Sequence, residues 1–472
     1  MAIKTKFSIA IFLFFFLITL AISREETDPE LKTCKHQCQQ QRQYDEHDKR
    51  ICMKECDEYH QMKQEREREK EDTDDEKEEN PYVFEYKDFD TILDTEDGRI
   101  SILNMFDKKS KLLRNVENYG LAVLEAKAHT FVSPHHFDSE VVFFNIKGRG
   151  IIGLVEEDKT ERFNLEAGDI IRVPAGTPMY LVNRDENEKL FIAALHMPSS
   201  PASAPLNFEA FFGPAGRNPE SVLTAFSSKV LQAAFKTSKG KLESVLDEHK
   251  KERIFKIQED VHSLAPKKTI WPFGGQFKGP FNIFSNNPSF SNQFGSLFEV
   301  GPSESKSDLE GLNLMLSFAN ITKGSMSTIY YNTHANKIAF VVDGEGYFEM
   351  ACPHMSSNSH SKHRRSSSAY HKINARLRPG MVFVVPAGHP FVTVASKNNN
   401  LKIVCFEVNA QRNKKLAFAG KNNIMLALDK TAKKLSFDMS AEKVDEIFKR
   451  DEEFFFPYDV DESKEERGHA DE

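Results

Sequence analysis

Many short apolar runs, separated by glycine and proline, follow one another from about residue 80. Short runs bounded by such turn residues predict strands of an antiparallel barrel or sandwich. The apolar patterning begins at Tyr82-Val83-Phe84, and the expected strands after it are 99–105, 121–130, 140–146, 151–155, 170–173, 179–182 and 190–195.

A helical period replaces the strand pattern after residue 220. Apolar residues recur at steps of four from Val222 to Ala234, and a second apolar set lies at 242–246. Spacing of this kind predicts amphipathic helices. Segments 235–246 and 437–448 share a Lys-x-x-x-[Val/Ile]-[Leu/Phe] ending, so we expect the second half of the chain to repeat the helices. Their apolar faces need a partner that covers them.

One segment occurs twice, at 167–178 and at 379–390. In each copy a glycine opens a short apolar run that ends in Pro-Ala-Gly-x-Pro, which predicts a strand bounded by turns. The offset between Gly148 and Gly344 is 344 − 148 = 196, whereas that between Pro174 and Pro386 is 386 − 174 = 212. The chain is therefore an internal duplication, and the difference of 16 fits one insertion at 356–371.

The duplicated residues resemble the cupin pattern, and two such motifs in tandem resemble the bicupin seed globulins of the 7S vicilin type. The resemblance extends from about residue 80 onward. Its residues are His136, Glu140, Gly148, Gly168, Pro174, Gly176 and Asn183 in the first half, and Asn332, Asn336, Gly344, Gly380, Pro386 and Gly388 in the second.

This resemblance implies an all-β dominated fold with two tandem cupin domains, each an antiparallel β-barrel or jelly roll followed by a helical arm. It further implies that the arms clasp neighbouring protomers in a homotrimer, and that the protein is stored in a vacuole. The expected domains are 1–23 signal peptide, 24–60 α-hairpin, 61–79 charged linker, 80–260 first cupin with arm, 261–280 connector, 281–455 second cupin with arm, and 456–472 acidic tail.

Composition narrows the class of partner. The chain has 472 residues, with 63 basic and 71 acidic side chains, a balance that does not favour a nucleic-acid partner. Lys4 and Lys6 precede an apolar run from Phe7 to Ile22, a signal-peptide pattern with cleavage expected before Arg24. The run is shorter than a bilayer span, so we expect a secretory protein without stable membrane association.

Four cysteines follow the signal peptide. Cys34 and Cys38, and likewise Cys52 and Cys56, lie one helical turn apart. Two helices joined by a turn can then be stapled twice, Cys34 to Cys56 and Cys38 to Cys52, in an oxidising compartment. Zinc binding with a nearby histidine is the less favoured alternative. The spacing resembles the α-hairpin segments that precede some vicilin cores and are released as separate peptides.

Three polar segments are candidates for proteolysis or glycosylation and not for catalysis. The linker at 61–79 has almost no apolar residue, and the insertion at 356–371 is rich in serine and histidine, so both are expected to be accessible to proteases. Asn320-Ile-Thr322 is the one glycosylation sequon, since Asn287-Pro-Ser289 is blocked by proline.

Catalytic cupins hold a metal with three histidines and a glutamate, and this set is incomplete here. The first half has only His136 and Glu140, since the remaining two positions are Pro134 and Met179. In the second half the positions are Tyr330, Asn332, Asn336 and Phe391. Because such metals need their full ligand number, the sequence predicts a non-enzymatic protein.

A different set of ligand types occurs in the second half. Strand alternation places Phe348, Met350, Cys352 and His354 on one face, and His389 lies in a turn that can return near them. One thiolate and two imidazoles suit copper and, next, zinc. Some vicilin-like globulins carry copper at such a position, so the resemblance implies one copper per chain. The alternative is that these are core residues, and a disulfide from Cys352 to Cys405 would compete with the metal.

Two function classes therefore remain. The first is a seed storage protein, a nutrient reservoir. The second is a globulin that binds copper or a small ligand, with a superoxide-dismutating side activity.

Overall fold

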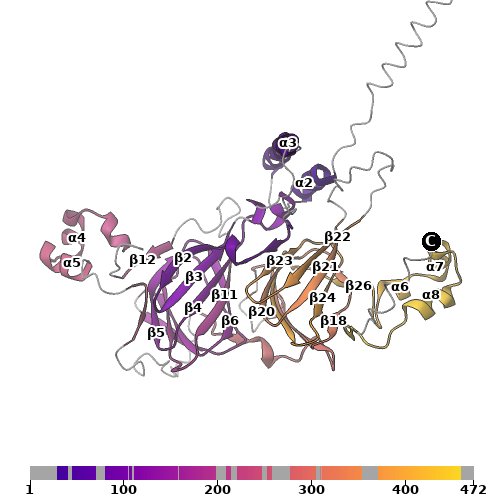
Figure 1. Ribbon diagram of the computed structural model, residues 1–472. Coiled ribbons are helices and arrows are strands. Elements are labelled where there is room, and N and C mark those ends of the chain that lie inside the picture. Colours follow the sequence, from indigo (N-terminus) through magenta and orange to yellow (C-terminus); the bar gives the residue numbers. More distant parts are fainter. Residues whose placement is uncertain are drawn as a thin grey trace, which may run out of the picture. The chain divides into compact units, whose positions relative to one another are not determined.

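The computed structural model describes residues 29–40, 45–70, 80–104, 106–108, 111–157, 159–197, 209–213, 221–246, 252–257, 277–304, 309, 311–352 and 370–458. They fall into two parts: an amino-terminal hairpin within 1–76, and a barrel body within 77–352 and 372–472 (Figure 1). The expected signal peptide, the insertion up to residue 369, the connector up to residue 276 and the end of the acidic tail lie outside the described residues.

The hairpin consists of helices α2 (Pro29–Gln40) and α3 (Glu46–Lys70). Disulfides join Cys34 to Cys56 and Cys38 to Cys52, with Cα atoms 6.0 and 5.8 Å apart, which confirms the pairing predicted from the spacing. The cysteines are buried, and among the described residues the hydrophobic side chains that pack against them are Leu31 and Met53. Sulfurs bonded in this way are not thiolates, so the cluster does not fit the zinc alternative. Helix α3 continues to Lys70, ten residues into the charged linker segment.

The first barrel is built from two antiparallel sheets, with strand orders β14-β9-β6-β11-β4-β3-β2 and β12-β5-β10-β7-β8; β13 also pairs with β5, and β14 is the short strand Phe281–Asn282. Apolar side chains such as Val141, Ile152 and Leu181 fill the space between the sheets. The strands are β2 (Asp90–Thr95), β3 (Gly98–Leu103), β4 (Gly120–Ala126), β5 (Thr130–Phe137), β6 (Glu140–Lys147), β7 (Gly150–Glu156), β8 (Lys159–Leu165), β9 (Asp169–Val173), β10 (Met179–Asn183), β11 (Leu190–Met197), β12 (Glu209–Phe211) and β13 (Ile254–Lys256).

The second barrel repeats this arrangement with sheets β1-β23-β20-β25-β17-β16-β15 and β22-β21-β24-β18-β27, while β19 pairs with β24 and β26; β1 is the short strand Val83–Phe84. Its strands are β15 (Phe290–Asn292), β16 (Gly295–Val300), β17 (Leu314–Ile321), β18 (Ser325–Ser327), β19 (Tyr330–Asn332), β20 (Asn336–Asp343), β21 (Gly346–Cys352), β22 (His371–Leu377), β23 (Val382–Val385), β24 (Phe391–Ala395), β25 (Leu401–Val408), β26 (Lys415–Ala417) and β27 (Phe455–Pro457).

The duplication read from the sequence is present in the strands. Strand β6 plus 196 residues gives β20 (140 + 196 = 336), and β10 plus 212 gives β24 (179 + 212 = 391). The repeated glycines have matching left-handed backbones, with φ of 86° at Gly148 and 81° at Gly344. A Cβ at either position would collide with the carbonyl oxygen of Lys189 or Asn400, so only glycine fits both turns.

The strand that leads into each barrel adds to the sheet of the other barrel. Strand β1 (Val83–Phe84) pairs with β23, and β14 (Phe281–Asn282) pairs with β9. The expected domains begin the first cupin at residue 80 and the second at residue 281, so each of these strands was expected in the barrel that follows it. The exchange covers the outer edges of β9 and β23, which would otherwise present unpaired backbone groups.

Aromatic rings join the two barrels. Phe144 stacks on Phe318 with ring centroids 6.2 Å apart, and Phe191 lies 6.1 Å from Phe340. Phe284 from the segment after β14 meets Phe318 edge to face at 5.1 Å. Such contacts make the barrels one apolar unit.

Each barrel is followed by a helical arm, as the period of four predicted. The arms contain α4 (Ser228–Phe235) and α5 (Lys239–Leu246), then α6 (Ile424–Ala427), α7 (Lys430–Phe437) and α8 (Ala441–Phe448). Adding 202 to the first and last residue numbers of α4 and α5 gives those of α7 and α8 (228 + 202 = 430; 246 + 202 = 448). Ser227 and Asp429 cap the first helix of each pair by accepting from the Val230 and Ala432 N–H groups. No helix in the described part of the chain is long and apolar enough to cross a membrane.

Candidate functional site

The first barrel holds His136 and Glu140 in structural contacts. The His136 ring stacks on Phe212 with centroids 5.3 Å apart. Glu140 accepts from Arg172 at 2.8 Å and from the Ala175 N–H at 3.4 Å. Pro134 and Met179, at the two other ligand positions, offer no imidazole. The carboxylate of Glu140 is thus engaged by a cation and a backbone donor.

Two histidines that the sequence analysis did not single out lie in the same barrel. His135 and His196 are buried, and both stand edge-on to the Phe137 ring, 5.0 and 4.8 Å from its centroid. His135 Nδ1 bonds the Ser133 carbonyl at 2.7 Å, and His196 Nδ1 lies 3.1 Å from Ser139 Oγ. Burial lowers the pKa of His196 to about 3 and that of His135 well below 6.5, so both are neutral at physiological pH.

A buried ion pair lies next to His135. Arg253, 2% exposed, donates to Glu209 at 2.8 Å, and the His135 Nε2 is 3.8 Å from the same carboxylate. Burial lowers the pKa of Arg253 to about 9, which leaves the guanidinium charged at pH 7. Glu209 lies in β12, and Arg253 directly precedes β13. Both strands pair with β5, so the ion pair joins the two segments that are held against β5.

In the second barrel the ligand positions carry amides with structural partners. The Asn332 amide donates to Glu407 at 3.3 Å, and the Asn336 carbonyl oxygen accepts from the Ala387 N–H at 3.0 Å. The rings of Tyr330 and Phe391 are tilted against each other, with centroids 4.5 Å apart. None of these four offers an imidazole or a carboxylate to a metal.

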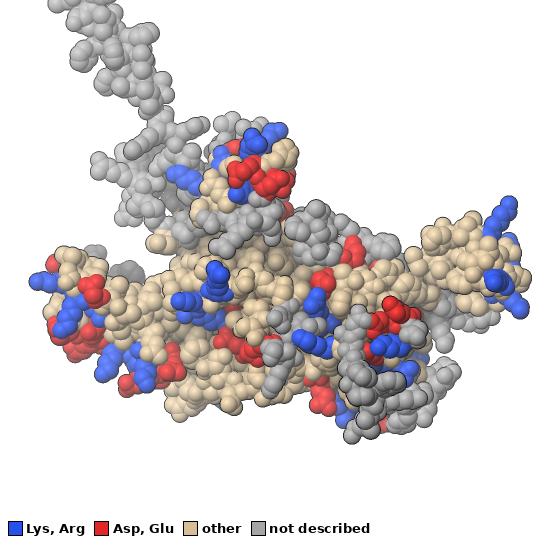
Figure 2. Space-filling view, turned by 180° about the vertical axis from the view of Figure 1, so that it is seen from behind, with Lys and Arg blue, Asp and Glu red and all other residues tan. Residues whose placement is uncertain are grey.

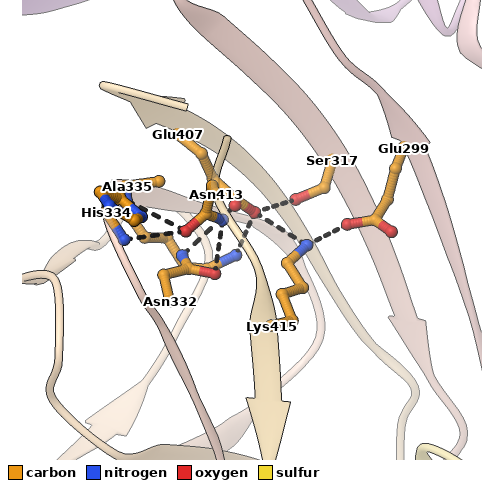
Figure 3. A network of polar contacts seen from close by, with 9 residues as sticks. Glu299, Ser317, Asn332, His334, Ala335, Glu407, Asn413 and Lys415 are labelled. Carbon is orange, nitrogen blue, oxygen red and sulfur yellow. Dashed lines mark hydrogen bonds and ion pairs between the residues drawn. The ribbon is translucent and has the colours of Figure 1, made fainter. Parts of the chain in front are cut away.

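A network of buried ion pairs and hydrogen bonds surrounds Glu407 in the second barrel (Figure 3). The Lys337 ammonium donates to Glu407 at 2.7 Å and Ser317 Oγ donates at 3.0 Å. Lys415 lies 3.2 Å from Glu407 and forms a second ion pair with Glu299. Two lysines and two glutamates make the network formally neutral. The Lys337 ammonium lies 5.9 Å from the ring centroid of Tyr330 and 5.8 Å from that of Phe391, and its positive charge opposes the binding of a cation beside these two rings.

The charges of the network hold each other ionised. Burial alone would raise the pKa of Glu407, but Lys337 and Lys415 outweigh it and lower that pKa to about 2. The pKa of Lys337 is raised well above 10.5, because its anionic neighbours outweigh the opposing effect of burial. The sequence analysis missed this network because its members lie on five separate segments and match no motif.

The structure brings Cys352 and His389 to one place. The burial of Phe348, Met350 and Cys352 in β21 follows the predicted alternation. The Ala351 N–H bonds the Pro390 carbonyl at 2.9 Å, which sets the end of β21 beside the turn that carries His389. His354 lies outside the described residues. Cys352 and Cys405 are both buried and in the reduced form, so no disulfide competes for the thiol.

Tyr82 completes this cluster and was not predicted. Its hydroxyl lies 3.2 Å from Cys352 Sγ, and its ring centroid is 6.4 Å from that of His389. The Nδ1 of His389 donates to the Ala387 carbonyl at 3.1 Å, which places the lone pair on Nε2. Burial lowers the pKa of His389, so the ring is neutral at pH 7. A reduced thiol and a neutral, oriented imidazole are the forms that a soft metal binds.

The predicted glycosylation site lies in the middle of a sheet. Asn320 is in β17, which pairs with β16 on one side and β25 on the other. Its side chain is partly exposed and its oxygen lies 3.4 Å from the Asn400 amide. Glycosylation at Asn320 stays a prediction.

Surface charge agrees with the composition. On the face seen in Figure 2, Lys and Arg are interspersed with Asp and Glu instead of forming a continuous basic stripe.

Comparison with known proteins agrees with the fold. The Cupin family model matches residues 108–241 and 281–445. A sucrose-binding protein of Glycine max is 55% identical and is aligned over 99% of both chains. The vicilin Jug r 6.0101 of Juglans regia is 49% identical over 97% of both chains. The crystal structure of vicilin from Corylus avellana superposes with a TM-score of 0.72 at 48% identity, covering 81% of this chain and 100% of that one.

Two tandem cupin barrels, each followed by a helical arm, define a bicupin of the globulin type. The chain belongs to the vicilin-like 7S globulins of the cupin family. Its function is that of a seed storage globulin.

Proposed function

We propose that this globulin is a non-catalytic nutrient reservoir, packed as a homotrimer and carried by the secretory route to a protein storage vacuole. The proposal rests on the helical arms. Both arms carry large apolar residues exposed to solvent, among them Val245 at 62% and its repeat equivalent Ile447 at 58%. Such a surface is covered by a partner in a soluble protein.

The repeated arms support a closed ring. Val245 and Ile447 are 202 residues apart, the same offset as the helices that hold them. Leu435, 80% exposed, and Phe235, 54% exposed, add to these faces. Each chain thus offers two related apolar surfaces, and a cyclic assembly buries both on every protomer.

Light scattering tests this assembly. We expect the protein at neutral pH and moderate salt to have three times the mass of one chain. Val245→Glu with Ile447→Glu places two charges in the buried contact and should give monomers. Lys434→Glu changes an exposed charge on the same arm and should leave the trimer intact. A monomeric mass for the unmodified protein would contradict the proposal.

A second proposal concerns Cys352, His354 and His389, which would hold one copper ion per chain. The contacts of Tyr82 support it, because they fix a reduced thiol and a neutral imidazole side by side in a buried place. Copper bound there would supply one-electron redox chemistry, including a superoxide-dismutating side activity. The chain's own contribution is to exclude water, to keep the thiol reduced and to orient His389 through Ala387.

Metal analysis after copper supplementation tests this site. The expected stoichiometry is one copper per chain, since the first barrel has no equivalent set. Cys352→Ser removes the softest ligand and should abolish binding and any thiolate-to-copper absorption, with the trimer intact. His136→Ala, in the first barrel, should leave the copper content unchanged. Absence of copper from the supplemented protein, or full retention by Cys352→Ser, would refute the site.

A further inference from the structure

A groove at the edge of the second barrel takes part in neither the assembly nor the copper site proposed above. It has a volume of about 250 Å³ and lies between the entry segment 80–87 and the end of β22. The charged residues that line it are Glu85, Lys87, Arg376 and Arg378. Three cations and one anion give the groove a formal charge of 3 − 1 = +2, although the chain as a whole carries −8.

The two arginines lie on the same side of their segment. Arg376 and Arg378 are exposed, whereas Leu377 between them is buried. In the part of the chain that the structure describes, neither guanidinium has an acidic partner or a hydrogen-bond acceptor. By contrast, Lys372 on the same strand pairs with Glu349 at 3.0 Å. Five N–H donors on each arginine therefore face solvent in the groove.

The strand exchange creates the groove. Pairing of Val83 with Phe383 and of Phe84 with Val382 holds the entry segment against β23. The Asn80 amide donates to the Asn374 carbonyl at 3.2 Å and closes one end. The exchange thereby brings Lys87 to a groove that it shares with arginines almost 300 residues later in the chain.

The first barrel provides an internal comparison. Positions 376 and 378 correspond to Asn164 and Glu166 (376 − 212 = 164; 378 − 212 = 166). There the Asn282 amide of the entering strand donates to Asp169 at 2.8 Å and to the Ala167 carbonyl at 2.9 Å. The corner of the first barrel is therefore acidic and closed by its own hydrogen bonds. The same fold forms without arginines, so folding does not account for them.

We infer that the groove of Lys87, Arg376 and Arg378 binds a small dianion of the phosphate monoester class. The charge of +2 matches such a dianion. Guanidinium groups donate paired N–H groups to phosphate oxygens, and a lysine adds a point charge that needs no fixed direction. Glu85 lines the same groove, and its negative charge opposes anion binding, so the net charge is +2 instead of +3.

Calorimetric titration of the full-length, secreted protein at low salt tests the inference, with inorganic phosphate and glycerol 3-phosphate as probes. We expect saturable binding at one site per chain that weakens as salt increases. Arg376→Ala and Arg378→Ala should each weaken it at least about tenfold, the effect of losing a charge-assisted hydrogen bond. Glu85→Gln removes the acidic side chain that lines the groove and should tighten phosphate binding. Succinate, a dianion without a tetrahedral centre, should bind more weakly than phosphate.

Lys372→Ala is the matched control, because it removes an exposed cation from the same strand and should change binding less than twofold. The substituted side chains are all exposed, namely Glu85, Lys372, Arg376 and Arg378. The variants should therefore keep the thermal unfolding temperature of the original protein. Cys352→Ser should bind phosphate normally, which separates this groove from the copper site. No saturable binding at millimolar phosphate, or equal weakening by Lys372→Ala, would overturn the inference.

Discussion

The hydroxyl of Tyr82 lies 3.2 Å from the Sγ of Cys352, although 270 residues separate them in the chain. Tyr82 enters the second barrel because β1, the strand that follows it, pairs with β23 instead of a strand of the first barrel. The contact therefore depends on the exchange of entry strands between the two halves.

Tyr82→Phe should destabilise the barrel body by about 1 kcal/mol, the usual net contribution of one buried hydrogen bond. Because the ring remains, packing is preserved, and the loss of stability measures the contribution of the hydroxyl alone. Urea unfolding measures the change. Tyr86→Phe, at a hydroxyl on a side chain 53% exposed, should have no effect. Equal stability of Tyr82→Phe and the parent protein would mean that the hydroxyl makes no net contribution beside Cys352.

Lys337→Met should cost about 3–5 kcal/mol, because it leaves the carboxylate of Glu407 buried with one ammonium in place of two. Adding Glu407→Gln should recover part of the loss, since the uncompensated charge is then removed. Lys402→Met breaks the exposed pair with Asp343, 2.9 Å apart, and should cost under about 1 kcal/mol. Chemical denaturation of the three variants distinguishes a buried network from a surface pair; similar losses for both lysines would contradict the assignment.

Stability should fall as the pH drops below 6.5, and His196 should account for part of this. The folded state keeps His196 neutral down to a pKa of about 3, whereas the unfolded state binds a proton below 6.5. The unfolded state then binds more protons, so the free energy of unfolding decreases by about 1.4 kcal/mol per pH unit for this residue. His135, whose pKa is also lowered by burial, acts in the same direction.

Unfolding curves between pH 7 and pH 5 test this dependence. His196→Asn removes the titrating group and should give a shallower slope, even where its stability at pH 7 is lower. Lys402→Met, at a surface lysine, should keep the original slope. An unchanged slope for His196→Asn would show that the imidazole is accessible to protons in the folded state.

Reduction should unfold the amino-terminal hairpin and leave the barrels folded. Apart from the four cysteines, Leu31 and Met53 are the hydrophobic residues that pack in its core within the described part of the chain, and bridges closing loops of this size contribute about 3 kcal/mol each. Dithiothreitol should therefore open tryptic sites at Arg50 and Lys54, seen by mass spectrometry of the full chain. Cys352 and Cys405 of the barrels are reduced and form no disulfide, so the barrels should resist the reductant. Resistance of the reduced hairpin would contradict the prediction.

Local patterns were enough to predict much of this fold. Glycine and proline turns marked the strands, a period of four marked the arm helices, and the spacing of four cysteines gave the disulfide pairs. These features depend on neighbours within one turn or one strand, so a short window contains the physical cause. The duplication could also be predicted from the sequence. Its glycines adopt left-handed backbones that other residues rarely adopt, so glycine occurs at the same position in both halves.

The sites were predicted less completely. Alternation along β21 and the turn at 386–390 were sufficient to place Cys352 near His389, but nothing local pointed to Tyr82. The network around Glu407 was missed for a similar reason: an isolated lysine or glutamate in an apolar run does not reveal which distant charge compensates it. Only pairing between strands brings Glu299, Lys337 and Lys415 to Glu407.

The sequence by itself thus determined the repeated barrels, the arms and the stapled hairpin, because each follows from local geometry and from periodic burial. The tertiary structure decided which barrel each entry strand joins. Covering the open edges of β9 and β23 requires backbone partners, and hydrogen bonds to a backbone do not depend on side-chain identity. For that reason the exchange left no signal in the residues of β1 and β14, and the neighbours of Cys352 and the groove at Arg378 became visible only in the folded chain.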